Sequence, residues 1–226
     1  METSLYERST TSVDDCAVLI ADTSDLIEEV FRLRYQVYCL EKGYETGRDG
    51  MEFDRYDDRA RHVLLVHRAS GQAIGTVRVI PSSHTGGVSG LPMSSVCGPG
   101  LLRGLPTWTT GEISRFAVSK RRRLSCRAGA MVRLGLMQGT LRLSRAMGLT
   151  HWCAIMEPVL LRLLQTNGIY FSPHGPLVEH RGLRQPASLD IDTVVDRTRA
   201  EQRDGWEYVT LGGALWGPLA STSVAA

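Results

Sequence analysis

The stretch 110–123 brings a carboxylate, a guanidinium and a run of cations into one short segment. Its first half is an apolar, β-rich run interrupted by Glu112 and Arg115. A carboxylate inside an apolar strand loses hydration, which raises its pKa and makes it a useful general base near neutral pH. Glu112 could instead form a structural ion pair with Arg115 or with Arg78, which lies within another apolar strand. The residues alone leave both interpretations open.

The second half of the stretch is cationic. Four consecutive cations, Lys120, Arg121, Arg122 and Arg123, are followed after a few small residues by Arg127 and a long helical pattern. A cationic turn that leads into a helix can bind a phosphate group, because free amide groups and the positive end of the helix dipole point toward it. The alternative is a solvated turn, which is what a charge run usually forms.

Hydrophobic periodicity predicts the elements that position these groups. Strands are expected at 16–21, 62–68, 73–80, 111–118 and 150–156, with later strands at 169–180 and 208–211. Helices are expected from about 26 to Gly43, from about Arg127 to Met147, from Pro158 to Asn167 and over 194–202. Antiparallel pairs come first and helical crossovers later, which predicts a mixed α/β sheet in a single domain.

The domain is expected to cover residues 16–211. Residues 1–15 are polar and are expected to be loose, and 212–226 are expected to form a C-terminal tail that is disordered from Gly217. The segment 81–109 holds most of the Gly, Ser and Pro punctuation. A long insertion of this kind inside a domain is usually functional or mobile.

Composition excludes several classes of protein. The net charge of +2 gives no general affinity for nucleic acid, and 42% hydrophobic with 22% charged residues is typical of a soluble globular protein. No stretch approaches a membrane span or a signal peptide. The five scattered cysteines lack metal or redox spacing, which favours a reducing cytoplasm, and no metal site is expected. No Gly-x-Ser-x-Gly elbow of a hydrolase is present.

Four motifs together resemble one family. They are Arg34–Tyr38, Met51–Asp54 with Asp57, Gly75–Arg78 and Glu112–Val118. In this order they resemble the autoinducer-synthase branch of the acyltransferase fold shared with the Gcn5-related N-acetyltransferases. The second half, with 156–164, 168–171 and 175–182, is similar to exosortase (PEP-CTERM) system-associated acyltransferases and long-chain N-acyl amino acid synthases. The resemblance covers roughly residues 16–195.

The resemblance implies an N-acyltransferase with a mixed central sheet, a splayed strand pair and flanking helices. It implies transfer of a long-chain fatty acyl group to the amine of an amino acid. The donor would be an acyl-phosphopantetheine on acyl carrier protein rather than on coenzyme A, since Arg127–Ala130 only partly matches the Gly-rich pattern of coenzyme A users. No tightly bound cofactor is implied. The amphipathic product suggests peripheral contact with a membrane.

The resemblance also assigns roles to residues. Glu112, Arg115 and Arg78 would be catalytic, with Glu112 removing the proton of the acceptor. A network of opposite charges, Arg34, Asp54 and Asp57 with the two other arginines, would shape the acceptor pocket. Val118, the cations 120–123 and Arg127 would bind phosphopantetheine and the carrier protein.

Apolar residues are candidates for an acyl channel. They are Leu134, Met137, Leu141, Trp152, Ile155 and Leu160. Plain core packing is the alternative for each of them. Gly135 and Gly139 would either leave room for the chain or allow close helix packing.

Strand alternation places Glu112 and Arg115 on opposite faces of their strand. The fold resemblance implies a β-bulge here, which would let the two side chains meet and splay the strand pair for the pantetheine arm.

Two other functions remain. One is an acyl-homoserine lactone synthase that uses S-adenosylmethionine. Tyr44 lies in a segment where homoserine lactone synthases typically carry Trp, which weakens this interpretation without removing it. The other is a binding module that retains the fold and binds acyl carrier protein without turnover.

Overall fold

The computed structural model describes residues 16–83, 85–122 and 129–216. Its centre is one mixed sheet with the strand order β1-β2-β3-β4-β5-β8-β6, and β7 pairs with β8. The strands are β1 (Cys16–Ala21), β2 (Arg61–His67), β3 (Ala73–Pro81), β4 (Thr110–Val118), β5 (His151–Met156), β6 (Ser172–Pro173), β7 (Val178–Glu179) and β8 (Leu183–Asp190). Only β4 and β5 are described as a parallel pair. The predicted mixed α/β sheet is confirmed.

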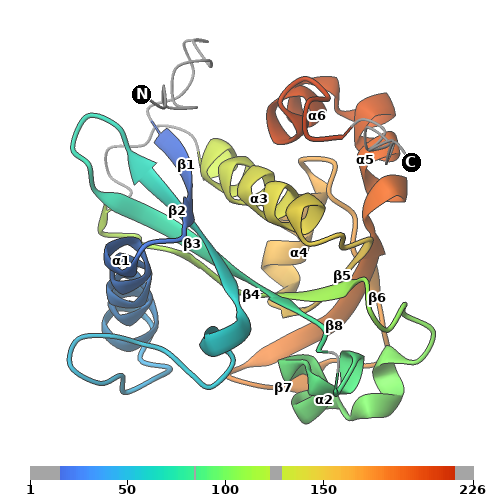
Figure 1. Cartoon of the computed structure of the whole chain (residues 1–226), viewed down its shortest axis with the longest axis horizontal. Coiled ribbons are helices and arrows are strands. Elements are labelled where there is room, and N and C mark those ends of the chain that lie inside the picture. Colours follow the sequence, from blue (N-terminus) through green and yellow to red (C-terminus); the bar gives the residue numbers. More distant parts are fainter. Residues whose placement is uncertain (1–15, 84, 123–128, 217–226) are drawn as a thin grey trace, which may run out of the picture.

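Helices cover both faces of the sheet, as Figure 1 shows. They are α1 (Ser24–Tyr35), α2 (Pro92–Cys97), α3 (Gly129–Ala146), α4 (Pro158–Gln165), α5 (Ile191–Glu201) and α6 (Arg203–Thr210). Alternation along β2 explains the two layers, because Val63 and Leu65 join the core under α3 while Leu64 joins the core under α1. The sheet is therefore buried on both sides.

Helix α1 begins at a conventional cap and ends in an unusual turn. The hydroxyl of Thr23 accepts a hydrogen bond from the amide of Leu26, and Asp25 complements the positive end of the helix. The chain continues without interruption into a π-helical turn, Gln36–Glu41 (η1). Such wide turns are rare and often lie at functional sites. Here η1 carries Tyr38 toward β4.

Two of the late elements differ from prediction. Residues 208–211 were expected to form a strand, but Tyr208 lies in α6, whose amphipathic face buries Trp206 and Val209. The expected strand at 169–180 reduces to the two-residue strands β6 and β7. The long partner of β5 is β8, which the sequence did not indicate.

The insertion 81–109 folds into short helical pieces around its own small core. These are η3 (Val88–Gly90), α2 and η4 (Pro99–Leu102). Leu91, Met93 and Leu102 are buried there against Ile80 of β3 and Cys153 of β5. The insertion thus packs against the central strands of the sheet, beside the site where β4 and β5 meet.

Gly139 allows α3 to approach the sheet closely. A Cβ atom there would overlap the side chains of Val63 and Val18. Of the two roles considered for Gly139, the structure supports close helix packing. We expect Gly139→Ala to lower the free energy of unfolding, because overpacking costs about 1–3 kcal/mol and exceeds the gain of roughly 1 kcal/mol from alanine's helix propensity.

Gly100→Ala is the matched control for chemical denaturation, because a Cβ at Gly100 meets no atom within 4 Å. It should change the unfolding free energy by less than about 0.5 kcal/mol. A Gly139→Ala protein as stable as the wild type would contradict the expected overlap with Val63.

Candidate active site

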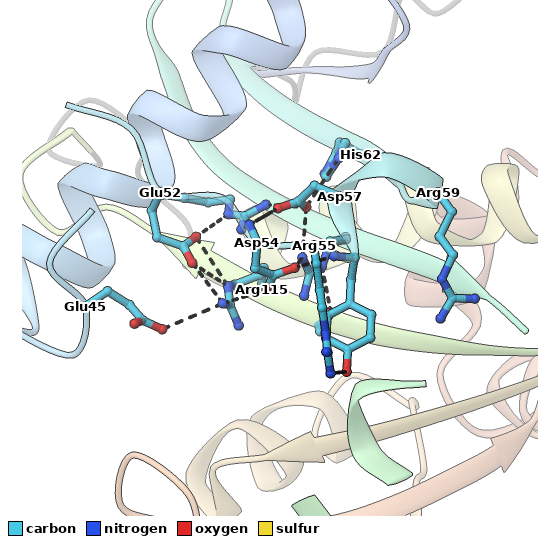
Figure 2. A network of polar contacts seen from close by, with 12 residues as sticks. Glu45, Glu52, Asp54, Arg55, Asp57, Arg59, His62 and Arg115 are labelled. Carbon is cyan, nitrogen blue, oxygen red and sulfur yellow. Dashed lines mark hydrogen bonds and ion pairs between the residues drawn. The ribbon is translucent and has the colours of Figure 1, made fainter. Parts of the chain in front are cut away.

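Three arginines from three elements, two of them fully buried, meet three carboxylates from one acidic segment (Figure 2). Arg34 comes from α1, Arg78 from β3 and Arg115 from β4. The carboxylates are Glu52, Asp54 and Asp57. We refer to these six residues as the ion-pair network. The acidic segment is anchored beside α1, where the amide of Glu52 donates to the carbonyl of Phe31 and the ring of Phe53 lies 5.6 Å from that of Phe31.

The network alternates in charge and is tightly bonded. Arg34 donates to Glu52 at 2.5 Å and with both terminal nitrogens to Asp57 at 2.8 and 3.1 Å. Arg78 donates to Asp54 at 2.7 Å and to Asp57 at 2.8 Å. Arg115 donates to Glu52 at 2.8 Å and to Asp54 at 2.9 Å. The predicted grouping of Arg34, Arg78 and Arg115 with Asp54 and Asp57 is present.

Electrostatics keep the network ionised. Burial alone would raise the pKa of the Asp57 carboxyl, but the hydrogen bonds and charges of Arg34 and Arg78 outweigh burial and hold that pKa far below its usual range. The pKa of Glu52 is likewise lowered against burial by Arg34 and Arg115. Three positive charges therefore balance three negative charges in a network that is largely buried, except at Asp54 and Arg115, whose side chains are 28% and 14% exposed.

A β-bulge brings Arg115 into the network. Arg78 pairs with Ser114 and Thr76 pairs with Ala117, so Arg115 and Phe116 together face one residue of β3. Arg115 has φ of +53°, a left-handed conformation that costs energy for a residue with a side chain. The bulge implied by the resemblance is present, and both Arg115 and Glu112 line the same cleft.

Glu112 is buried but lies outside the ion-pair network. Its side chain accepts a hydrogen bond of 2.7 Å from the amide of Met93 in α2, and the residue is 3% exposed. Burial raises the pKa of Glu112 to about 7, although the Met93 amide and the charges of Arg78 and Arg115 act to lower it. Within the described residues Glu112 forms no salt bridge. Those arginines are bound to the other carboxylates instead.

A cleft of about 630 Å³ opens between β4 and β5. The two strands are hydrogen-bonded only over Thr110–Glu112 and His151–Cys153, and beyond these residues they diverge. Glu112, Ser114 and Phe116 line the β4 side, and Ile155 and Met156 line the β5 side. The splayed pair is therefore present, with Glu112 at the point of divergence.

The predicted donor-binding residues lie in different places. Val118 and Lys120 line the cleft where β4 ends, near Val132 of α3. The side chain of Arg122 forms a salt bridge of 2.9 Å with Glu29 of α1, away from the cleft lining. Arg121 is exposed. Arg123 and Arg127 lie outside the described residues.

The six candidates for an acyl channel are not brought together. Ile155 and Leu160 line the cleft. Met137, Leu141 and Trp152 line a separate apolar cavity of about 20 Å³, room for roughly one small molecule such as water and too little for a chain. Leu134 is buried in the main core. Of the six, only Ile155 and Leu160 line the cleft that contains Glu112.

Several site residues were missed by the sequence. Glu52 lies within the Met51–Asp54 motif. The available signal was a third acid, beside Asp54 and Asp57, in a segment expected to pair with arginines. The amide of Met93 gives no signal, because any residue supplies one. Lys42 and Arg184 line the cleft from the segment after η1 and from β8, and the sequence shows them only as isolated cations. Tyr44, from the segment where homoserine lactone synthases typically carry Trp, lines the cleft beside Lys42.

His62 packs against the network as a neutral ring. Its Nε2 lies 3.7 Å from Asp57, its ring meets the edge of Phe31, and it is 3% exposed. Burial, with the charge of Arg34, lowers the pKa of His62 to about 4 against the opposing charge of Asp57.

This lowered pKa predicts acid sensitivity. The unfolded chain takes up the proton first, so the contribution of His62 to stability is complete above pH 6.5 and is lost as pH falls toward 4. Between pH 7 and pH 5 the loss should be about 2 kcal/mol. We expect the unfolding free energy of His62→Phe, measured by denaturant titration, to fall less than that of the wild type over this range. Parallel curves would contradict a neutral His62.

Neither a metal centre nor a membrane helix is found in the described ranges. No group of three or more His, Cys, Asp or Glu residues there is arranged to hold a metal ion. No helix there is long and apolar enough to cross a membrane.

A mixed sheet whose parallel strands diverge beside a buried carboxylate places the protein in the class of Gcn5-related N-acetyltransferase-like folds. Residues 29–189 match the family model of the N-acyl amino acid synthase FeeM, and the chain belongs to this family of N-acyltransferases. The autoinducer-synthase-like resemblance and the prediction of an enzyme are both confirmed.

Relatives include both kinds of acyltransferase. The chain is 31% identical over 176 residues to the isovaleryl-homoserine lactone synthase of Bradyrhizobium diazoefficiens, and the aligned region covers 74% of each chain. It is similar to the structure of a coenzyme A-dependent acyl-homoserine lactone synthase, BjaI, with SAM and isopentyl-CoA, at 25% identity and a TM-score of 0.61 over 89% of both chains.

The structure of FeeM from uncultured soil microbes is alike in fold. It has 16% identity and a TM-score of 0.62, covering 83% of this chain and 96% of FeeM. The acyltransferase class is thus common to these relatives, whereas their names differ in the acceptor.

Proposed function

We propose that the protein transfers a long-chain fatty acyl group from acyl carrier protein to the α-amine of an amino acid, which gives an N-acyl amino acid. The observation that carries this proposal is Glu112, a buried carboxylate with a pKa of about 7 at the base of the cleft. Family membership supplies the reaction class. A base with a pKa near the working pH is suited to deprotonating an amine.

The reaction follows from this placement. Glu112 accepts a proton from the acceptor amine, directly or through a water, and the freed lone pair forms the new C–N bond at the thioester carbonyl. The tetrahedral intermediate collapses with loss of the pantetheine thiolate, which takes up a proton. Beyond Glu112 the edge of β4 that faces β5 has no ladder partner in β5, so its amide groups are suited to bind the pantetheine arm and the carbonyl oxygen.

Acyl carrier protein is proposed over coenzyme A as the donor. Its support is the partial Gly-rich pattern at 127–130 and the cationic turn that follows β4. Lys120 lines the cleft at this end and is suited to a phosphopantetheine phosphate. The BjaI relative is described as coenzyme A-dependent, so both donors belong in the assay.

An acyl-homoserine lactone synthase is the second candidate. It is favoured by the 31% identity to an isovaleryl-homoserine lactone synthase. In that reaction the amine of S-adenosylmethionine is acylated and its carboxylate displaces methylthioadenosine to close the lactone. Methylthioadenosine is released only in this alternative, so it separates the two reactions.

The test is a purified assay with acyl donors of short to long chain, each on acyl carrier protein and on coenzyme A. Acceptors are the protein amino acids and S-adenosylmethionine, and products are identified by mass spectrometry. An N-acyl amino acid formed from a long-chain carrier donor is expected. A lactone with methylthioadenosine would instead support the second candidate. Binding of acyl carrier protein without any product, unchanged in Glu112→Gln, would indicate a binding module.

A further inference from the structure

Two cations and one carboxylate form a cluster at the η1 and β8 side of the cleft. Lys42 Nζ lies 3.0 Å from Oε1 of Glu157, and Arg184 Nη1 lies 2.8 Å from the same oxygen. Lys42 follows η1, Arg184 lies in β8, and Glu157 is the residue between β5 and α4. Three elements distant in sequence thus converge, and we call these residues the Lys42 cluster.

The Lys42 cluster has an excess positive charge. A single carboxylate is shared by both cations, whereas the ion-pair network has three charges of each sign. Arg181, which also lines the cleft, is paired with Glu45. The charge of Glu41 also acts on Lys42, but its carboxylate is bonded to Ser119 and to the amide of Lys120, so within the Lys42 cluster itself two cations share one carboxylate.

Arg184 is the most firmly held member of the cluster, whereas the side chains of Lys42 and Glu157 are 31% and 39% exposed. The Arg184 side chain is 11% exposed, and it donates to the carbonyls of His180 at 3.2 Å and Arg181 at 2.7 Å. The ring of Tyr44 lies near both cations, 5.3 Å from Lys42 and 5.8 Å from Arg184. Burial is the main cause that lowers the pKa of Lys42, and Arg184 lowers it further. An anion at this place would relieve that repulsion.

Strand register places the cluster beside the diverging strands. Glu112 pairs with Cys153 in the parallel β4–β5 ladder. Glu157, just after the end of β5, is four residues beyond Cys153, which is roughly 13 Å farther along the direction of the strand. This is the level of Arg115 and Phe116 on β4. Lys42, Glu157 and Arg184 line the same cleft as Glu112. The amine and the carboxylate of an α-amino acid are joined to one carbon and cannot span roughly 13 Å, so an acceptor held at the cluster reaches Glu112 through waters in the cleft.

We propose that Lys42 and Arg184 form the subsite for the carboxylate of the acceptor, with Tyr44 as its floor. The subsite holds the acid while the amine faces the thioester and passes its proton to Glu112 through water. This inference rests on the proposed acyl transfer to an amino acid. It applies equally to S-adenosylmethionine, because that acceptor also carries a carboxylate beside its amine.

Paired acceptors test the subsite. The L-amino acid that reacts fastest in the acceptor assay is compared with its carboxamide, and S-adenosylmethionine with its decarboxylated form. In the wild type, KM should be lower for each acid than for the partner that lacks the carboxylate, which we call the neutral partner because it is uncharged at that position. In Lys42→Met and Arg184→Gln, KM for the acid should rise about 10–100-fold, with little change in kcat and in KM for the neutral partner.

Two further variants sharpen the test. Glu157→Gln removes the competing carboxylate, so KM for the acid should fall. Arg162→Met is the matched control, because Arg162 is an exposed cation of the adjoining helix α4 outside the cleft lining. It should keep the wild-type preference for the acid over the neutral partner. Equal KM values for both partners in the wild type, or equal rises for both in the variants, would overturn the proposal.

Binding without turnover separates this inference from the proposed function. Melting temperatures of Glu112→Gln protein are measured with each amino acid, with S-adenosylmethionine and with their neutral partners. Stabilisation by an acid alone, lost on adding Lys42→Met, is expected. If no acid stabilises the protein, the subsite is excluded. If an acid binds but the wild type makes no amide, the proposed reaction fails and the subsite stands.

Discussion

Replacement of Glu112 by glutamine should lower kcat/KM for amide formation by about 10²–10⁴-fold, the usual contribution of a positioned general base. Glutamine keeps the shape of the side chain and an oxygen that can accept the hydrogen bond from Met93. The loss is therefore expected without a change in fold. Initial rates with a saturating acyl donor measure it.

The pH profile gives an independent signature of the same group. Burial raises the pKa of Glu112 to about 7, so kcat/KM of the wild type should rise about tenfold per pH unit below pH 7 and bend near that value. The acceptor amine adds its own rise at higher pH in both proteins. Glu112→Gln should lose only the bend near 7.

Stability provides the control. The folded pKa of Glu112 lies above its unfolded value of 4.5, so the stability that it contributes is lost as pH rises through 7. At pH 8 Glu112→Gln should therefore melt at or above the temperature of the wild type. Wild-type activity in a folded Glu112→Gln protein would exclude this residue as the base.

Asp57→Asn should be among the most damaging single changes to stability. The carboxylate bonds to Arg34 and Arg78, whose side chains are 0% and 1% exposed. Loss of its charge leaves two buried guanidinium groups undercompensated, which costs about 3–5 kcal/mol. For a chain of this size that lowers the melting temperature by about 6–20 °C, measurable by calorimetry.

Glu207→Gln is the control for this change. It removes one carboxylate from the Arg203–Glu207 pair on α6, whose side chains are 72% and 49% exposed. Exposed pairs of this kind contribute less than about 1 kcal/mol. Equal effects of the two substitutions would mean that the ion-pair network does not support the fold.

Much of the architecture could be predicted from the sequence because apolar periodicity is strong in β1, β2, β3, β4 and α3. Strand β8 could not be predicted in this way. Its segment, Leu183–Asp190, contains Arg184, Gln185 and Pro186, and proline is disfavoured inside a sheet. Pairing with β5 overrides these local preferences, since Ala187 and Leu189 are buried.

The site was predictable in its charges and not in its geometry. Arginines within apolar strands must find partners, which led to Arg78, Arg115 and the acidic segment. Which carboxylate stays outside the network depends on the bulge at Arg115 and on the insertion that covers Glu112. These are tertiary features, and neither residue type nor spacing encodes them locally.

The contact between α2 and Glu112 has a consequence for how catalysis can change by mutation. The donor is a peptide amide, so a substitution of the Met93 side chain, proline excepted, does not remove it. Insertions or deletions within 81–109 can displace it. The acidity of the base is thus buffered against most point mutations, and divergence in loop length is the route by which related enzymes could acquire different pH optima.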